Sequence, residues 1–532
     1  MAKQFDYLAD HALPVGTRVR IRLHGRPVGG WVVGSEVEPP AGVALRSLVA
    51  LSGHGPPPEV VAVAEWAAWR WAVPVATLLR AASPERNVRD LPEPPSTRGR
   101  PTATRTAELH RLPPAADPLP AILDALSAAG SGSVVVLVPN VGWAERLSAR
   151  LRRRGIEVAG SWAEAAAGWP VVVGSRTSAW APVPRLGGAV VVDAHDEAYR
   201  HRWDAVEVLA ERAARQRAPF LALSPTPTAV QAARWPLTVP ARPEEAAGWP
   251  AVSVLDRRGA DPRTGILSEE LARLDLRPLV CVLNRTGRAR LLACRACGEL
   301  ARCERCGRPV EAADDVFSCR ACGAARPQVC ARCGATTMKV LRQGVSMVRD
   351  QLEALLGEPV GEVSGPRAEV PDAAVIVGTE AVLHRVRRAA AVVFLDFDQH
   401  LLAPRFSAAE QALALLARAG RLVGGRGSAG SGVVLVQTRL PDHDVLAAAV
   451  HGDPDRLDER ELRRELDLPP FAALAVASGA GAVEYAQALG GADLGDGRWL
   501  LRAPDHRALC DALAAAPWPA ETLRLTVDPT DV

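Results

Sequence analysis

The chain has 532 residues, of which 48% are hydrophobic and 23% are charged, and a prior of about 150 residues per domain predicts three to four globular units. Its 63 basic and 60 acidic side chains give a formal net charge of +3, which excludes a histone-like polycation and a long acidic tail. Any polyanionic partner is therefore expected to meet local basic patches.

No apolar run reaches the roughly 18 residues that a membrane span needs, and the opening residues lack the apolar core of a signal peptide. A cytoplasmic protein is therefore expected. In a reducing compartment, cysteines favour metal ligation over disulfides, and eight of the ten cysteines fall between Cys294 and Cys333. Only two of the basic residues are lysines, Lys3 and Lys339.

The first predicted element is a β-hairpin in RVRIRLHGR, where Arg18, Arg20 and Arg22 alternate with apolar residues before a glycine-rich turn. The cationic face of this hairpin has two open interpretations, a solvated strand face or a surface that contacts phosphates. Residues 1–90 are predicted as one N-terminal domain. Proline-rich sequence then predicts a linker over residues 91–105.

Two series of short β-branched runs follow, separated by alanine-rich segments of helical length. The first comprises SVVVLVPN, PVVVGSR, GAVVVDA and FLALSP, and the second LVCVLNR, AAVIVGT, AAVVFLD and SGVVLVQ. Apolar strands that alternate with helices predict parallel sheets covered on both faces. The predicted fold class is α/β, with two doubly wound lobes over residues 106–246 and 247–460. A cysteine-rich insertion at 293–335 interrupts the second lobe, and a small α+β domain is predicted over 461–532.

The cysteine-rich insertion contains four CxxC hooks, each followed by glycine. Two thiolates from one tight turn can take adjacent tetrahedral corners of zinc, and glycine tolerates the positive φ that closes the turn. The spacers hold 5, 12 and 7 residues, so the first two hooks hardly reach one ion, whereas the middle spacer suits a hairpin. This nesting predicts two structural zinc ions, one held by Cys294, Cys297, Cys330 and Cys333 and the other by Cys303, Cys306, Cys319 and Cys322. The two outlying cysteines, Cys281 and Cys510, are predicted to be buried small residues.

Several longer strings resemble the primosomal replication-restart (PriA) family, namely VVVGSRTSAWAPVPRLGGAVVVDAHDEAY, FLALSPTPT, LNRTGRARLLACRACGELARCERCGRPV and the terminal VDP. The resemblance covers nearly the whole chain. It implies a superfamily 2 helicase fold with two RecA-like lobes and an N-terminal small β-barrel that binds a DNA 3′ end. It also implies binding of single-stranded DNA and of abandoned or branched replication forks, and reloading of the replicative helicase with primosome and helicase-loading proteins as partners.

Within the N-terminal domain, the resemblance places DNA contacts at Phe5, Asp6, Tyr7, Gly30 and Arg46. An aromatic ring can stack on a terminal base, and an aspartate can accept a hydrogen bond from a free 3′-OH. Together with the three hairpin arginines, these residues form the predicted DNA-binding set.

The ATP-handling motifs of the family are altered in this sequence. A P-loop needs a lysine within GxxxxGK[ST], but the chain reads RLPPAADPLPAIL at that place. The family's DEEH is reduced to Asp193 and His195, so the glutamate that polarises the attacking water is missing or displaced to Glu197. In the arginine-finger motif, Gly425 and Ser428 stand at the arginine positions. Asp193 and His195 are therefore predicted to mark a degenerate nucleotide site.

These departures predict a catalytically inactive helicase homologue that binds forked DNA and does not use ATP as a cofactor, with nucleotide binding without hydrolysis left open. One alternative is an ATP-dependent 3′–5′ DNA helicase with an unconventional nucleotide site, which predicts DNA-stimulated phosphate release. Another is a zinc-ribbon scaffold that only bridges proteins, which predicts that loss of the three hairpin arginines leaves DNA affinity unchanged.

Overall fold

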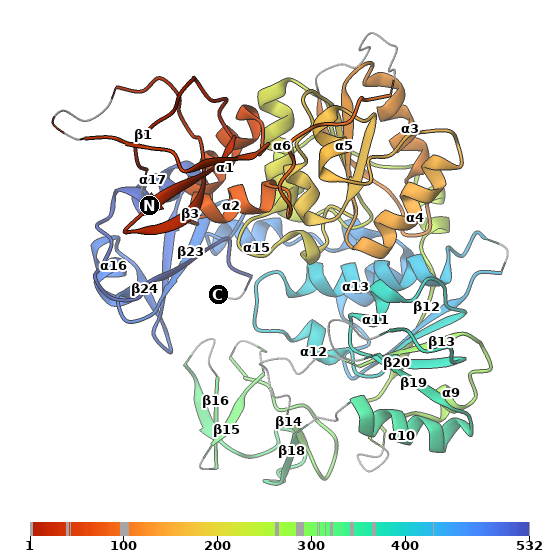
Figure 1. Cartoon of the computed structure of the whole chain (residues 1–532). Coiled ribbons are helices and arrows are strands. Elements are labelled where there is room, and N and C mark those ends of the chain that lie inside the picture. The colour runs from red at the N-terminus through yellow and green to blue at the C-terminus, as the bar shows by residue number, and fades with distance from the viewer. Residues whose placement is uncertain are drawn as a thin grey trace. The chain divides into compact units, whose positions relative to one another are not determined.

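The computed structural model describes residues 4–38, 42, 44–95, 106–260, 265–283, 292–305, 307, 309–313, 315–319, 323–340, 345–363, 369–428 and 430–530. Its chain forms two compact units (Figure 1). The first comprises Met1–His110, Asp117–Thr238 and Leu462–Pro529, and the second comprises Arg111–Ala116, Val239–Glu461 and Thr530–Val532. Among the described residues, every helix is too short or too polar to cross a lipid bilayer.

The N-terminal part of the first unit contains the predicted hairpin. β2 (Arg18–Leu23) pairs antiparallel with β3 (Arg26–Trp31), and the two residues between them, His24 and Gly25, both have positive φ, as tight hairpin turns require. β5 (Ala50–Gly53) pairs with the other edge of β2. β1 (Tyr7–Leu8) and β4 (Arg46–Ser47) form a separate parallel pair, and the helices α1 (Pro58–Arg70) and α2 (Val75–Ala82) follow.

A six-stranded sheet with the order β11-β6-β10-β9-β7-β8 forms the middle of the first unit. Its neighbouring pairs β11–β6, β10–β9, β9–β7 and β7–β8 are parallel. All five residues of β7 are buried, which explains why this strand reads as a continuous apolar run. The strands are β6 (Ala107–Arg111), β7 (Ser133–Leu137), β8 (Val171–Gly174), β9 (Leu186–Val192), β10 (Phe220–Ser224) and β11 (Leu237–Thr238).

Helices connect these strands in alternation. They are α3 (Leu119–Ala128), α4 (Val141–Arg152), α5 (Trp162–Ala167), α6 (Ala205–Gln216) and α7 (Ala229–Arg234), with short 3-10 helices η1 (Arg176–Trp180) and η2 (Glu197–Tyr199). Side-chain caps begin several of them. Asn140 accepts from the Trp143 N–H at the start of α4, and Asp204 accepts from the Val206 N–H at the start of α6.

The C-terminal part of the first unit is an antiparallel sheet with the order β24-β25-β23-β26 and two packed helices. This arrangement matches the expected α+β character. Its elements are β23 (Ala473–Ser478), α16 (Ala482–Ala488), β24 (Ala492–Gly495), β25 (Arg498–Ala503), α17 (His506–Ala515) and β26 (Arg524–Val527).

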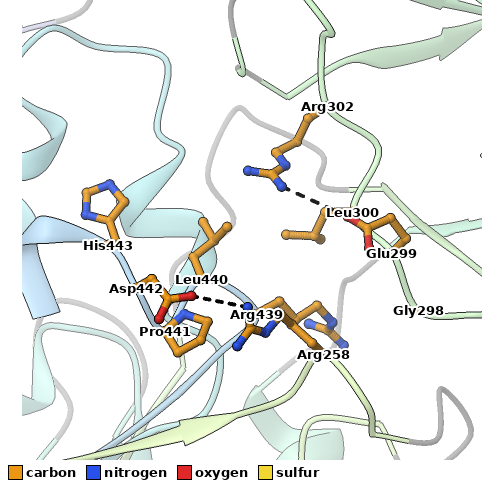
Figure 2. A pocket seen from close by; sticks show the side chains of 10 residues that line it. All are labelled: Arg258, Gly298, Glu299, Leu300, Arg302, Arg439, Leu440, Pro441, Asp442 and His443. Carbon is orange, nitrogen blue, oxygen red and sulfur yellow. Dashed lines mark hydrogen bonds and ion pairs between the residues drawn. The ribbon is translucent and has the colours of Figure 1, made fainter. Parts of the chain in front are cut away.

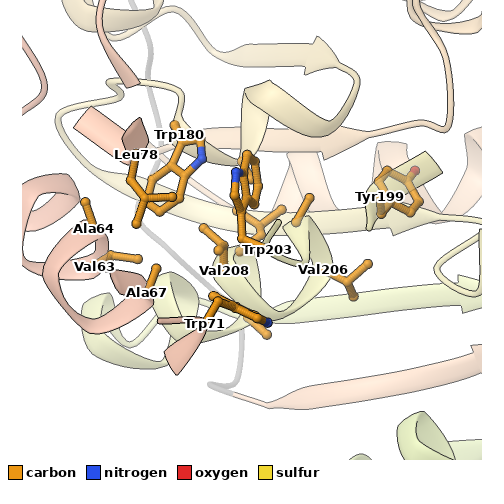
Figure 3. Packing of buried hydrophobic residues seen from close by; sticks show 14 of the residues in the cluster. Val63, Ala64, Ala67, Trp71, Leu78, Trp180, Tyr199, Trp203, Val206 and Val208 are labelled. Carbon is orange, nitrogen blue, oxygen red and sulfur yellow. The ribbon is translucent and has the colours of Figure 1, made fainter. Parts of the chain in front are cut away.

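One apolar core joins the three parts of the first unit. Figure 3 shows side chains of α1 and α2, among them Val63 and Leu78, beside Trp180 and Trp203 from the middle sheet's connections. The ring centroids of these two tryptophans lie 5.3 Å apart in an edge-to-face arrangement. Segments that the sequence presents as three domains therefore share one hydrophobic core.

The second unit is built on a six-stranded sheet with the order β12-β22-β21-β13-β20-β19, in which all five neighbouring pairs are parallel. Its strands are β12 (Ala251–Asp256), β13 (Leu279–Val282), β19 (Val360–Val363), β20 (Val375–Gly378), β21 (Ala391–Phe394) and β22 (Val433–Thr438). Its helices are α8 (Arg242–Gly248), α9 (Glu269–Ala272), α10 (Val345–Leu356), α11 (Val382–Arg385), α12 (Asp398–Leu401), α13 (Ala408–Val423), α14 (Asp444–His451) and η4 (Pro454–Arg456), and α15 (Arg460–Glu465) spans the boundary between the units.

The cysteine-rich insertion follows β13 as small antiparallel sheets. β14 (Leu292–Cys294) pairs with β18 (Met338–Val340), and β15 (Glu311–Ala313), β16 (Val316–Ser318) and β17 (Ala325–Pro327) form a meander. The predicted α/β fold class with parallel sheets and a cysteine-rich insertion is confirmed. The exact domain limits, including the lobe boundary at 246/247, stay a prediction.

Candidate metal centre and nucleic-acid surface

The first and last CxxC hooks form one cluster. The Sγ atoms of Cys294, Cys297, Cys330 and Cys333 all lie within 4.8 Å of one another. The Sγ atoms of Cys294 and Cys333 are 3.5 Å apart, and those of Cys297 and Cys330 are 3.6 Å apart. Sulfurs at the corners of a zinc tetrahedron with Zn–S bonds of about 2.3 Å stand roughly 3.8 Å apart. The cluster is therefore compatible with a bound metal ion of the zinc type.

Each hook is closed by its glycine. The N–H of Gly298 donates to the carbonyl of Cys294 at 3.0 Å, and the N–H of Gly334 donates to that of Cys330 at 3.0 Å. Both glycines have φ near +77°, the left-handed region that a Cβ disfavours. The local backbone thus turns two thiols of each hook toward the same point.

The second predicted quartet is described only in part. Cys303 and Cys319 are both buried in the small core of the insertion around Phe317, and the hairpin of β15 and β16 joins their hooks. Cys306 and Cys322 lie outside the described residues. The ligand set Cys303, Cys306, Cys319 and Cys322 therefore stays a prediction.

The two outlying cysteines are buried, as expected. Cys281 lies fully buried in β13, and burial raises the pKa of its thiol to about 12. Cys510 lies fully buried in α17, where its Sγ donates to the carbonyl of Arg70 at 3.2 Å, and burial raises its pKa to about 11. Both behave as neutral core side chains.

Four of the predicted DNA-end residues, Phe5, Asp6, Tyr7 and Arg46, lie in β1 and β4 or directly before β1. Tyr7 stands opposite Arg46 in this parallel pair, and the Tyr7 hydroxyl donates to the carbonyl of Arg22 in β2 at 3.0 Å. Phe5 is 47% exposed and Asp6 is exposed beside it. An unburied aromatic ring and a carboxylate thus lie next to strand residues that carry guanidinium groups.

The three hairpin arginines differ in what they contact. Arg18 Nη1 donates to the carbonyl of Pro84 at 3.0 Å, so this side chain ties the hairpin to the segment after α2. Arg20 and Arg22 are exposed, and their guanidinium groups make no hydrogen bond or ion pair with any residue that the structure describes. Gly30 lies in β3, and a Cβ there would meet nothing nearer than 3.9 Å.

Asp193 and His195 both follow the carboxyl end of β9, at the edge where open α/β sheets bind ligands. Asp193 follows β9 with a φ of 52° and is 5% exposed. His195 is 6% exposed, and its Nδ1 shares a hydrogen bond with Ser224 Oγ, at the end of β10, at 2.9 Å. The next backbone carbonyl, of Ala194, accepts from Gln231 Nε2 at 2.7 Å. Hydrogen bonds within the chain therefore hold this edge.

The connection from β6 to α3 corresponds to RLPPAADPLP. Asp117 occupies the start of α3, where its Oδ1 accepts from the Leu119 N–H at 3.1 Å. Arg150 donates to both Asp117 oxygens, at 2.5 and 3.1 Å. Burial raises the pKa of Asp117, but the hydrogen bonds from Arg150 and Leu119 outweigh it and lower the pKa below its usual range. The helix terminus that could hold a phosphate already carries a carboxylate of this chain.

Arg111, the last residue of β6, begins this connection, and its partners belong to the second unit. Its Nε forms an ion pair with Glu245 Oε1 at 2.7 Å, and its two Nη atoms donate to the carboxylate of Asp455 at 2.6 and 2.8 Å. The Arg111 and Glu245 side chains are only 4% and 2% exposed. The cation nearest to this connection in the sequence is thus fully engaged.

The loop after α13 has no room for arginine at position 425. A Cβ on Gly425 would lie 2.4 Å from the carbonyl oxygen of Ala247 and 3.0 Å from the Cα of Gly248. The neighbouring Arg426 points elsewhere, because its Nη2 donates to the carbonyl of Pro250 at 2.8 Å. Burial lowers the pKa of Arg426.

The first zinc-type hook also borders a cavity of about 360 Å³ in the second unit (Figure 2). Glu299, Leu300 and Arg302 from the insertion line it together with the segment that follows β22. Each arginine in its wall is paired with a carboxylate, through the contacts Arg258–Asp256 (2.7 Å), Arg258–Asp442 (3.2 Å), Arg302–Glu299 (4.0 Å) and Arg439–Asp398 (3.5 Å).

A family model described as the 3′DNA-binding domain (3'BD) of PriA matches residues 1–84. This range includes every predicted DNA-end residue from Phe5 to Arg46. The fold and this match define an α/β protein with a 3′DNA-binding domain and a cysteine cluster suited to a metal.

Curated relatives narrow this class. Replication restart protein PriA of Treponema pallidum is 28% identical over 57% of this chain and 51% of its own, and that of Haemophilus influenzae is 24% identical over 64% and 53%. The probable replication restart protein PriA of Mycobacterium tuberculosis is 27% identical over 90% of this chain and 84% of its own. The chain thus spans about half the length of the first two. The chain is therefore similar in sequence to the PriA proteins.

Proposed function

We propose that this chain acts in replication restart by binding abandoned or branched forks through a DNA 3′ end, and that it helps primosome and helicase-loading proteins to reload the replicative helicase. The observation that carries this proposal is the match of residues 1–84 to a 3′DNA-binding domain. The geometry supports it, because Phe5 and Asp6 are exposed beside the strands that carry Arg22 and Arg46. The replicative partners are inferred from the relatives.

We further propose that the chain binds DNA without hydrolysing ATP. Three features support this. Asp117 occupies the start of α3, Arg111 is held in a buried ion pair, and Gly425 has no room for an arginine side chain. Phosphoryl transfer depends on cations placed around the developing charge, and none of these three positions provides a free cation.

We propose two structural zinc ions as the cofactors. The cluster of Cys294, Cys297, Cys330 and Cys333 supports the first, and the sequence of the remaining two hooks supports the second. When bound, such an ion would hold the hooks together by thiolate coordination and supply folding energy rather than catalysis. Elemental analysis of the purified chain is expected to give two zinc ions, and one ion would limit the proposal to the first quartet.

The decisive experiment compares fork binding with a free and a phosphate-blocked 3′ end by fluorescence anisotropy. We expect tighter binding to the free 3′-OH, and we expect Asp6→Ala to remove most of that preference. Asp10→Ala is a matched control, because Asp10 is an exposed acid in the same segment. Equal affinity for both forks in the unaltered chain would overturn the 3′-end proposal, and absence of fork binding would favour the bridging scaffold.

The same preparations test the second half of the proposal. Phosphate release from ATP is expected to stay at the level of a protein-free blank with or without fork DNA. A rate that rises when fork DNA is added would instead establish an active helicase homologue with an unconventional nucleotide site.

A further inference from the structure

The second unit contains another open cavity, of about 320 Å³, lined by the end of α13, the loop that follows this helix, the residues before β21, and Ala115. Its polar side chains are Arg387, Arg388, Arg421, Ser428 and Ser431, and the rest of its wall is glycine backbone and small apolar side chains. None of the ten residues that line it is acidic. Three guanidinium groups therefore face one space without a neutralising carboxylate in its wall.

Two of these guanidinium groups have no internal role. Arg387 and Arg388 are exposed, and neither makes a hydrogen bond or ion pair with any part of the chain that the structure describes. The cavity beside the zinc-type hook differs, because each of its arginines is paired with a carboxylate. An unpaired arginine pair beside a third guanidinium is suited to an external anion.

Capping of α13 does not account for these arginines. Carbonyls at the end of this helix accept from backbone groups instead, through the pairs Gly424 N–H to Gly420 O (2.9 Å), Ala389 N–H to Leu422 O (3.1 Å) and Gly432 N–H to Val423 O (2.8 Å). Cations often stabilise a helix end by binding its last carbonyls, but here that need is met.

The wall of the cavity is fixed by close backbone packing. A Cβ on Gly432 would lie 2.1 Å from the carbonyl oxygen of Ala390, so only glycine lets the loop after α13 approach the start of β21 this closely. Arg387 and Arg388 directly precede Ala389 and Ala390, whose N–H groups bond to Leu422 and Pro278. These backbone contacts hold the loop with its two serines next to the segment that carries the arginine pair.

We propose that this cavity binds a phosphate group of a polynucleotide backbone. Guanidinium groups and serine hydroxyls are common donors to phosphate oxygens. The wall contains no aromatic ring on which a base could stack, so it is suited to a backbone phosphate rather than to a whole nucleotide. The proposal extends the DNA-binding function proposed above to a second contact, outside residues 1–84.

The test uses the full chain and a single-stranded oligonucleotide with a phosphate-blocked 3′ end, measured by anisotropy from low to high salt. R387Q/R388Q is expected to reduce the slope of log affinity against log salt by about 0.7, the value for one lost phosphate contact to single-stranded DNA. R387K/R388K should restore most of that slope, because lysine retains the charge.

R153Q/R154Q is the matched control, since it removes an adjacent exposed pair of arginines after α4. It is expected to leave the slope within experimental error of the unaltered chain. An equal loss in both double variants would show a general effect of charge and overturn the assignment. A second measurement uses a reagent that modifies arginine side chains. If inorganic phosphate or ATP protects the arginines of the cavity from this reagent and the oligonucleotide does not, the assignment is overturned as well.

The outcome can be separated from that of the 3′-end proposal. R387Q/R388Q is expected to keep the ratio of affinities for free and blocked forks, whereas Asp6→Ala changes this ratio and keeps the salt slope. Loss of 3′-end preference in the unaltered chain therefore leaves this second contact open to its own test. Thermal unfolding of each variant tests whether the fold is retained.

Discussion

Charged side chains are paired within the chain along the connection from β6 to α3, but two of them are unpaired on the N-terminal strand β2. Along the connection, Arg111 pairs with buried Glu245, and Asp117 pairs with Arg150. On β2, Arg20 and Arg22 extend from the surface without a partner in the described part of the chain. A charge that is neutralised within the chain stabilises the fold, whereas an unpaired surface charge remains available to a ligand.

This contrast distinguishes two kinds of change in a relative of PriA proteins. The charged groups of the connection from β6 to α3 are neutralised by partners within the chain, while the domain that matches a 3′DNA-binding family keeps unpaired arginines. If the contrast is correct, substitutions along the connection should change stability, and substitutions on β2 should change DNA affinity.

The largest expected effect follows removal of Arg111. Arg111→Ala leaves the carboxyl of Glu245, whose side chain is 2% exposed, without its cation. Burial already raises the pKa of Glu245, and loss of Arg111 removes the larger of the two cationic charges that oppose this shift, the other being Arg242. We expect the free energy of unfolding to fall by about 3 kcal/mol, measured by urea unfolding of the full chain.

The double variant Arg111→Met with Glu245→Leu provides the control, because it replaces the buried pair with apolar groups. It should recover most of the lost stability. If Arg111→Ala alone costs less than about 0.5 kcal/mol, the pair does not stabilise the fold, and the statement that paired charges of the connection serve stability is wrong.

Asp396 gives an intermediate case, a buried acid whose charge the chain does not neutralise. It follows β21, it is 7% exposed, and its Oδ1 has no hydrogen-bond partner among the described residues. Burial and then the charge of Asp398 raise the pKa of Asp396 to about 6. The folded state therefore binds this proton more tightly than the unfolded state, and stability should fall as pH rises from about 4 to about 6.

Asp396→Asn should remove this part of the pH dependence and raise the free energy of unfolding above pH 7 by on the order of 2 kcal/mol. Thermal unfolding at intervals between pH 4 and pH 8 measures both effects. A variant with the same pH profile as the unaltered chain would show that Asp396 is ionised throughout and solvated in the folded protein.

Substitution of the hairpin arginines should have a smaller effect, which is measured as a change in DNA affinity. R20Q/R22Q should lower the salt slope for forked DNA by about 1.8 and weaken binding roughly tenfold, with no change in stability. Arg18→Gln should do the reverse, because Arg18 donates to the Pro84 carbonyl. We expect it to cost about 1 kcal/mol of stability and to leave the slope unchanged. Equal slopes for both variants would remove the distinction between these residues.

Much of the fold follows from local sequence. The strands of both parallel sheets are short β-branched runs, and β7 and β13 are buried along their whole length, so period and composition identify them. The hooks are equally local, since a glycine after the second cysteine sets the turn that presents both thiols. Their nesting into one quartet follows from spacer length alone.

The rest depends on residues that are distant in the chain. Arg18 and Arg20 occupy equivalent places in one alternating pattern. Hydrogen bonds from Arg18 to the carbonyls of Pro84 and Arg86, 66 and 68 residues away, distinguish them. Arg111 meets Asp455 across 344 residues. The arginine pair at 387 and 388 precedes an ordinary apolar strand, and no local signal indicates that it shares a cavity with Arg421. Patterns identify elements, but pairing of charges is a tertiary property.

The smallest expected effect concerns Asp117 and Arg150, whose side chains are 46% and 38% exposed. Asp117→Asn should lower the free energy of unfolding by less than about 1 kcal/mol, and high salt should abolish the difference. Because the pKa of Asp117 is lowered in the folded state, its contribution is present above its usual pKa and is lost as pH falls below that range. We expect Asp117→Asn to bind nucleotide no better than the unaltered chain, because the connection still lacks a lysine and glycine-rich backbone. An ATP-dependent rise in melting temperature in Asp117→Asn alone would instead show that this one carboxylate keeps a phosphate from the start of α3.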